Sequence, residues 1–232
     1  IEEVDAKQTE EFVEEIAPPF IEIQSCLVNL SIFNCYSYLC VDAKQYNMDV
    51  NLMRKLPVGI QTFEKIRREN FLYVDKTALM WQIAAKSAPC FLSRPRRFGK
   101  SLLLSTFEAY FEGKRELFEG LAAEQLENEW NVHPVLHLDL NAEKYDRPEA
   151  LDAMLSNHLT QWESVHGKGE DETTLSRRFA GVIRRACEQT GRGVVVLVDE
   201  YDKPFLQALG NMPLLEYYRD TLKAFYGVLK SA

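Results

Sequence analysis

Residues 94–101, Arg-Pro-Arg-Arg-Phe-Gly-Lys-Ser, have the composition of a phosphate-binding loop. They follow a short apolar run at 89–92 and precede an apolar helical stretch that starts at Leu102. A strand that ends in a tight turn and continues into a helix directs backbone N–H groups and the positive end of the helix dipole at one point. In such a loop Lys100 would neutralise the β and γ phosphates of a nucleotide, and Ser101 would hold a magnesium ion.

A second candidate segment lies about a hundred residues later, where the apolar run 194–198 continues into Asp199 and Glu200. Five consecutive apolar and mostly β-branched residues indicate a strand that is buried on both faces. Open α/β sheets bind ligands at the carboxyl ends of their strands. There Asp199 would coordinate magnesium and Glu200 would polarise the attacking water. The alternative is that both carboxylates cap the following helix, but the upstream loop favours the nucleotide site.

Four blocks of the sequence together resemble a known family. They are residues 56–67, 71–77, 93–102 and 198–204. In this order they resemble the AAA-ATPase-like domain at the front of bacterial proteins that often carry a PD-(D/E)XK nuclease-like domain behind it. The usual loop is G-x-x-x-x-G-K-[ST], and Arg94 occupies its first glycine position. The family shares this form, so the resemblance implies that Arg94 is a family trait.

The resemblance and the loop chemistry together predict the site residues. The catalytic candidates are Glu200 and Lys100, and the metal candidates are Ser101 and Asp199. The nucleotide-binding candidates are Arg94, Arg96, Arg97, Phe98, Gly99, Lys100, Ser101 and Leu102. The implied cofactors are ATP and Mg²⁺. ATP is favoured over GTP by resemblance, and the sequence contains no N-K-x-D guanine motif.

Three functions are consistent with these residues. The first is Mg-ATP binding, with hydrolysis that drives a conformational change in an attached or partner module. The second is a nucleotide-dependent interaction scaffold that does not hydrolyse ATP. The third is the ATPase part of a nuclease or defence protein; no nuclease motif is found in residues 1–232, so nuclease chemistry is not assigned here.

Composition restricts these functions further. The chain has 232 residues, 46% of them hydrophobic, and no apolar run of membrane-spanning length. No secretory signal pattern is present at the N-terminus, so we expect a cytoplasmic protein, and the resemblance implies that it is bacterial. Residues 1–52 hold ten acidic and two basic side chains; the total of 35 acidic and 27 basic therefore leaves 25 of each for residues 53–232. This neutral remainder gives no support for a broad nucleic-acid surface.

Cysteine and histidine spacing gives no sign of a structural metal or a disulfide framework. The five cysteines are an odd number without C-x-x-C spacing. The four histidines show neither zinc-finger nor H-E-x-x-H spacing, so we interpret them as surface or packing residues.

Helical and strand patterns alternate from residue 53 onward, which predicts an α/β fold. By resemblance this is a P-loop NTPase-like three-layer α/β/α fold with a parallel sheet. The predicted core strands are 89–92, 135–140 and 194–198, and residues 71–74 are expected to be extended. The predicted helices are 62–69, 77–86, 102–111, 148–163, 175–189 and 213–230. Asp139 ends the second core strand and could cap a helix or lie near the nucleotide.

Two domains are expected. Residues 1–52 form an acidic and apolar N-terminal extension, with strand-like material at 20–41, and residues 53–232 form the AAA-ATPase-like domain. The extension is either foreign to the domain or a small added element that packs on it. By resemblance, the strand that carries the γ-phosphate sensor should follow Asp199 and insert beside it, and no such strand is seen. We therefore expect a C-terminally incomplete fragment whose open sheet edges could lead to a homo-oligomer.

Overall fold

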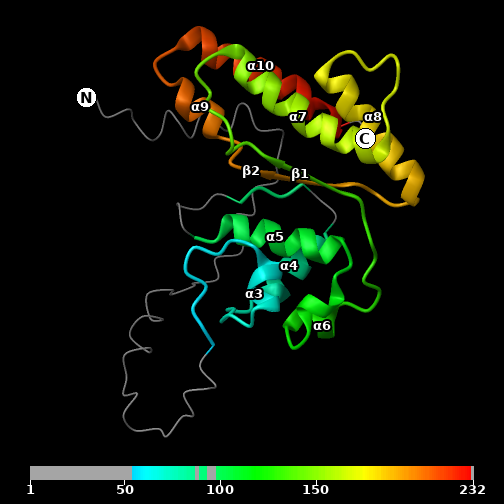
Figure 1. Ribbon diagram of the computed structural model, residues 1–232. Coiled ribbons are helices and arrows are strands. Elements are labelled where there is room, and N and C mark those ends of the chain that lie inside the picture. Colours follow the sequence, from blue (N-terminus) through cyan, green and yellow to red (C-terminus); the bar gives the residue numbers. More distant parts are fainter. Residues whose placement is uncertain (1–53, 87–88, 93–97, 231–232) are drawn as a thin grey trace, which may run out of the picture.

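The computed structural model describes residues 54–86, 89–92 and 98–230 of the chain. Within them a parallel two-stranded sheet lies between two layers of helices (Figure 1). Strand β1 (Val135–Asp139) pairs with β2 (Val195–Asp199) so that Val135 lies beside Val195 and Asp139 beside Asp199. Both strands confirm sequence predictions to within one residue at each end, and the mixed arrangement is consistent with the α/β class.

The pattern of side chains along the strands explains why helices cover both faces. Successive strand residues point to opposite faces. Leu136 and Leu138 of β1 belong to one hydrophobic core, whereas Val135 contacts the other. In the same way Val196 of β2 packs against the first core and Leu197 belongs to the second. A strand that is apolar on both faces is stable only when both faces are covered.

One helical layer, drawn above the sheet in Figure 1, comes from the chain after β1, partly between the two strands and partly after β2. Its core includes the stacked rings of Phe179 and Phe225, whose centroids are 4.4 Å apart. The elements of this layer are α7 (Pro148–His166), α8 (Leu175–Thr190), α9 (Lys203–Ala208), α10 (Met212–Gly227) and the 3-10 turn η4 (Val228–Lys230).

The other layer, drawn below the sheet in Figure 1, comes from the chain before β1. Its core is aromatic: Phe63 packs against Tyr73 and Phe118 with ring centroids 5.1 and 4.9 Å away. The elements of this layer are α3 (Phe63–Arg68), α4 (Thr77–Ala84), α5 (Lys100–Phe111), the 3-10 turn η3 (Arg115–Phe118) and α6 (Ala122–Leu126). All six predicted helices are confirmed, whereas η3, α6 and α9 were not predicted.

Asp75 and Thr77 join helices α4 and α6 of this layer. The Asp75 carboxylate accepts hydrogen bonds from the backbone N–H of Thr77 and of Ala122, both at 2.8 Å. The fully buried Thr77 hydroxyl accepts another from the backbone N–H of Ala123 at 3.0 Å. Because the first N–H groups of a helix lack partners within the helix, these side chains satisfy donors at the starts of both α4 and α6. Asp75 and Thr77, which belong to the 71–77 block, therefore have a role in stabilising the fold.

The strand predicted at 89–92 is wrong, since these residues are described and form no strand. Residues 71–74, expected to be extended, also form no strand. A strand requires a neighbouring strand about 4.8 Å away to complete its hydrogen bonds. Among the described residues β2 pairs only with β1, so the 89–92 segment has no ladder to join. The predicted extension, residues 1–52, lies outside the described residues.

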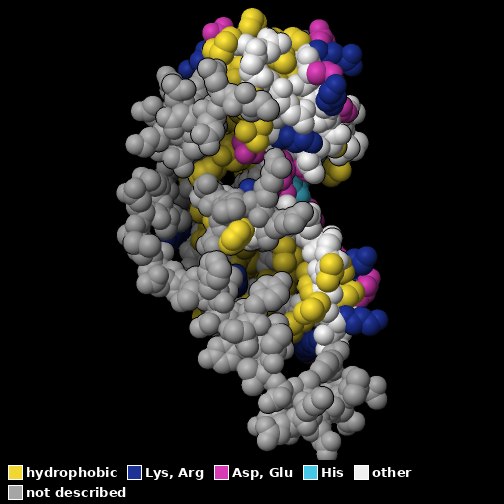
Figure 2. Space-filling model, turned by 90° about the vertical axis from the view of Figure 1, so that its left-hand side faces the viewer, with side chains coloured by type: hydrophobic (Ala, Val, Ile, Leu, Met, Phe, Trp, Pro, Cys, Tyr) yellow, Lys and Arg dark blue, Asp and Glu magenta, His cyan; other side chains and the backbone are white. Residues whose placement is uncertain are grey.

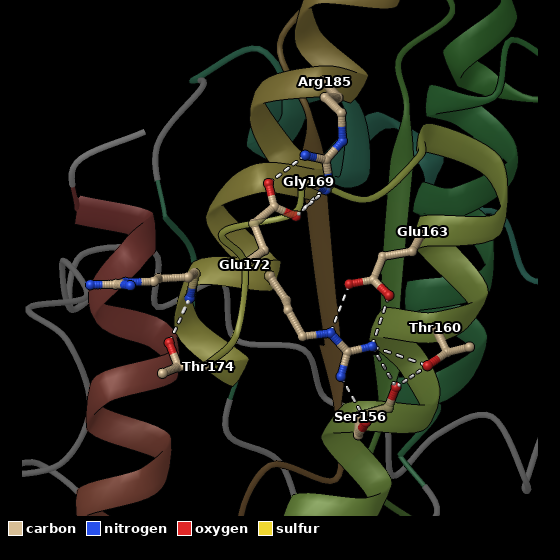
Figure 3. Close-up of polar contacts among 9 residues, drawn as sticks. Ser156, Thr160, Glu163, Gly169, Glu172, Thr174 and Arg185 are labelled. Atoms are coloured by element: carbon tan, nitrogen blue, oxygen red, sulfur yellow. Dashed lines mark hydrogen bonds and ion pairs between the residues drawn. The ribbon is translucent and has the colours of Figure 1, made fainter.

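Buried ion pairs fasten α7, α8 and the loop between them (Figure 3). Two nitrogens of the Arg178 guanidinium bind the two oxygens of Glu163 at 2.7 and 2.8 Å. Arg178 also donates to the Ser156 hydroxyl at 2.7 Å and to the Thr160 hydroxyl at 3.0 Å. The Arg178 and Glu163 side chains are only 11% and 7% exposed. The hydrogen bond from Arg178 holds the pKa of Glu163 below its usual value.

A second pair, between Glu172 and Arg185, holds the loop before α8 against that helix (Figure 3). Glu172 also accepts a hydrogen bond from the backbone N–H of Gly169 at 3.1 Å. Gly181 makes room for this carboxylate, because a Cβ at position 181 would lie 1.8 Å from the Glu172 Oε1 atom. The close approach of the loop to α8 therefore requires a glycine at this position.

We predict that Arg178→Met lowers the free energy of unfolding by about 3–5 kcal/mol, because it leaves the buried Glu163 carboxylate without its partner. The matched control is Arg177→Met, since the neighbouring Arg177 is exposed and should change stability by less than about 0.5 kcal/mol. Urea denaturation of the three proteins at pH 7 measures the difference. Equal losses for both variants would show that the pair contributes nothing specific.

The difference in unfolding free energy between wild type and Arg178→Met should also depend on pH. A lowered pKa means that Glu163 stabilises the folded state fully above its unfolded pKa and loses this contribution as pH falls through the folded pKa. The stability gap between wild type and Arg178→Met should therefore be constant near neutral pH and should narrow below about pH 4.5. A gap that widened on acidification would contradict this assignment.

Candidate functional site

The amino end of α5 begins directly after Gly99. Gly99 is the N-cap and has φ of 74°, a left-handed conformation that glycine adopts without the strain of a Cβ. Glycine has no side chain that could cap the helix, so the N-cap residue forms no side-chain hydrogen bond with the first N–H groups of α5. The helix that the sequence predicts at 102–111 therefore begins two residues earlier, at Lys100. Arg94, Arg96 and Arg97 lie outside the described residues, and their role stays a prediction.

Phe98 and Leu102 flank this helix start in different ways. Phe98 is 53% exposed, whereas Leu102 is half-buried and packs against the core below the sheet. The Leu102 side chain therefore anchors α5, and only its backbone N–H could face a ligand.

Asp139 and Asp199 end the two strands side by side, because they are register partners in the parallel ladder. The alternation of side chains places both on the face that α5 covers, along with His137. Asp199 is 9% exposed, and its Oδ1 accepts a hydrogen bond of 3.0 Å from the backbone N–H of Glu200. The Asp139 Oδ1 likewise accepts one of 2.8 Å from the N–H of Asn141.

Two contacts show that α5 runs antiparallel to the strands. The carbonyl of Phe111, at the end of α5, accepts a hydrogen bond of 2.8 Å from the N–H of His133, just before β1. Glu108 forms a 3.4 Å ion pair with His137 in the middle of β1. From Glu108 back to Ser101 the helix rises by about 10 Å. The amino end of α5 is thus directed toward the edge where both strands end.

His137 was interpreted as a surface or packing residue. In the structure it lies on the face of β1 that α5 covers and pairs with Glu108. The hydrogen bond to Glu108 raises the pKa of His137, and the charges of Asp139 and Asp199 act in the same direction. His137 therefore connects α5 to the strand face that holds both aspartates. The sequence contained a signal for this, since His137 precedes Asp139 by two residues in a strand and must share its face.

Neither Asp139 at the end of β1 nor the pair Asp199 and Glu200 at the end of β2 caps a helix through its side chains. The N-cap of α9 is Asp202, which forms no side-chain capping bond, and the N-cap of α7 is Arg147. The capping alternatives for Asp199, Glu200 and Asp139 are therefore wrong. Their carboxylates have a different location, at or next to the carboxyl end of the sheet.

Glu200 has a strained backbone. Its φ is 53°, a left-handed conformation that costs a residue with a Cβ roughly 1–2 kcal/mol. Its N–H donates to Asp199, and its carbonyl accepts a 3.0 Å hydrogen bond from the N–H of Lys203. Strained non-glycine residues are concentrated at functional sites, where neighbouring contacts hold them.

Acidic side chains and a histidine gather between the two helical layers on the face shown in Figure 2. No group of three or more His, Cys, Asp or Glu side chains in the described ranges could hold a metal ion on its own. A metal at this edge would therefore need oxygen ligands from a bound molecule or water in addition to the chain.

No helix in the described ranges has the length and apolarity needed to cross a membrane.

We predict that Glu200→Gly raises the free energy of unfolding by about 1 kcal/mol relative to Glu200→Ala, because only glycine is free of strain at this φ. The two variants remove the same carboxylate, so the comparison isolates the backbone effect. Parallel urea titrations would measure it. If the alanine variant were equally stable, Glu200 would not be strained in solution.

Comparisons with known proteins found similar sequences. The model of the AAA-ATPase-like family, described as "Predicted AAA-ATPase", matches residues 57–232. A protein of Azotobacter chroococcum mcd 1, described as an uncharacterized protein in the vnfD 5′ region, is 40% identical over 183 residues. The alignment covers 77% of this chain but 35% of that relative. No solved structure matches the chain.

Proposed function

The chain belongs to the predicted AAA-ATPase family, and from this premise we propose that it binds Mg-ATP at the amino end of α5 and hydrolyses it. The observation that supports this most strongly is the direction of α5. Its Gly99-Lys100-Ser101 start is directed toward the sheet edge where Asp199 and Glu200 follow β2. This direction supports a single site built from candidate phosphate-binding groups and carboxylates of segments about a hundred residues apart.

We assign a task in this site to several of the candidate residues. The N–H groups at the start of α5, with the Lys100 ammonium, bind phosphate oxygens, because the helix dipole and the lysine charge both favour an anion there. Gly99 permits the turn into the helix. Glu200 accepts the proton of the attacking water. Arg94, Arg96 and Arg97 would add positive charge near the same phosphates.

The donors at this edge suit magnesium. Mg²⁺ prefers oxygen ligands and is usually held by one or two protein groups together with substrate phosphates and waters. The Ser101 hydroxyl and the Asp199 carboxylate would be these groups. A carboxylate that is 9% exposed has lost part of its hydration, and a bound cation would compensate for this loss. When bound, the ion would neutralise the charge that develops on the phosphates.

Hydrolysis would be coupled to a conformational change in an attached or partner module. The chain spans about a third of the length of the relative it matches, so such a module and its activity are proposals for the whole protein. The nuclease-like partner and a homo-oligomer stay predictions.

We predict that Lys100→Ala lowers ATP affinity by about 100-fold, because it removes a charge-assisted contact worth up to about 3 kcal/mol. Lys223→Ala on the exposed surface of α10 is the control and should bind like wild type. Isothermal titration calorimetry with ATP and magnesium measures both. Equal affinity for wild type and Lys100→Ala would overturn the site.

Substitutions of the Glu200 and Asp199 carboxylates should have different effects on binding and hydrolysis. Glu200→Gln should keep ATP affinity and lose hydrolysis, because it removes only the proton acceptor. Asp199→Ala should instead weaken the dependence of ATP binding on magnesium, because it removes a metal ligand. Titrations at several magnesium concentrations and a phosphate-release assay distinguish them. If Glu200→Gln lost ATP binding as fully as Lys100→Ala, this division of roles would be wrong.

A further inference from the structure

The two loops that follow the strands are joined by a side-chain contact between Lys203 and Asn141. The Lys203 ammonium donates to the Asn141 side-chain oxygen at 2.9 Å and also to its backbone carbonyl. Asn141 lies two residues after the end of β1, and Lys203 is the first residue of α9. The contact therefore crosses the carboxyl edge of the sheet, beside Asp139 and Asp199.

A second contact fixes the same two segments. The side-chain oxygen of Gln207 accepts a hydrogen bond of 2.7 Å from the backbone N–H of Tyr145. Gln207 follows Lys203 by one helical turn, so both side chains lie on one face of α9. The buried Tyr145 hydroxyl donates to the carbonyl of Leu140 at 2.8 Å, which closes the β1 loop on itself. The start of α9 is thus held along a loop that is ordered by its own contacts.

This anchored helix start determines the turn that contains Glu200. The Lys203 N–H donates to the Glu200 carbonyl, and the Glu200 N–H donates to Asp199. A left-handed glutamate persists only where neighbouring contacts hold it. The Asp199 contact fixes one side of Glu200, and Lys203 fixes the other through both its backbone and its side chain.

We propose that Lys203 is a positioning residue for hydrolysis: through Asn141 it holds the turn that sets the place of the Glu200 carboxylate. The proposal rests on the proposed function, in which Glu200 accepts the proton of the attacking water. Lys203 itself contacts neither ATP nor water in this role. Its loss should therefore impair hydrolysis without impairing nucleotide binding.

The test compares Lys203→Met, which removes the ammonium but keeps most of the aliphatic stem, with Lys223→Met on exposed α10. We expect Lys203→Met to lower kcat by about 10- to 100-fold, because small displacements of a catalytic group have effects of this size. Its ATP dissociation constant, measured by calorimetry, should change by less than about threefold. Hydrogen exchange of a peptide covering residues 199–205 should become faster, and Lys223→Met should match wild type throughout.

Two further variants separate positioning from general stability. Asn141→Ala removes the side-chain acceptor, so Lys203→Met should cause a smaller additional loss in that background than in wild type. Lys203→Arg keeps the charge and donors and should recover part of kcat. If Lys203→Met does not fold, as judged by thermal unfolding, Asn141→Ala provides the test alone, with the same expected split between kcat and ATP affinity.

The outcomes are distinguishable. Wild type that binds ATP but releases no phosphate would overturn the proposed hydrolysis and this inference together. Active wild type with unchanged kcat in folded Lys203→Met and Asn141→Ala would overturn only the inference. A parallel loss of kcat and ATP affinity would also overturn it, because it would show that the contact supports the whole site.

Discussion

The in-register parallel pairing of β1 with β2 is the contact on which both cores and the candidate site depend. It aligns Asp139 with Asp199 and separates the side chains of each strand between two helical layers. A shift of one residue in β1 would turn His137 and Asp139 toward the core that holds Leu136 and Leu138, and would turn these leucines away from it. The alternation of polar and apolar side chains in β1 therefore favours the same register that brings the two carboxylates together.

Sequence patterns predicted the elements with strong periodicity. The β-branched run before Asp199 and the apolar periodicity of α7 and α8 are local signals, and they gave the correct element types. The segment 89–92 shows the limit of such signals, because an apolar run becomes a strand only when a neighbouring strand completes its hydrogen bonds. The missed elements η3, α6 and α9 have at most six residues and give little periodic pattern, whereas α3, also of six residues, was predicted within the longer segment 62–69.

Within the candidate site, a helix after the loop, which begins two residues earlier than predicted, and the location of Asp199 and Glu200 at the end of a strand followed from the sequence. The contacts that hold them did not. Lys203 and Asn141 are 62 residues apart, and neither has a local signature for the other. His137 is different from these two residues, because its spacing of two from Asp139 in a strand is a local signal that puts both side chains on one face. This signal was not used in the prediction. Pairing between distant segments is a property of the fold, so single-sequence reasoning identifies candidate groups more readily than the contacts that position them.

The conformation of Glu200 connects the stability of the turn with its proposed chemistry. If the turn after β2 served only to lead the chain into α9, glycine would adopt φ of 53° without strain, as Gly99 does at the start of α5. A glutamate there costs roughly 1–2 kcal/mol, and the contacts from Asp199 and Lys203 must offset this cost. Strain that is maintained by specific contacts on both sides is better explained by a requirement for the side chain than by a requirement for the turn. This supports the proposal that the Glu200 carboxylate, and not only its backbone, has a task at this edge of the sheet.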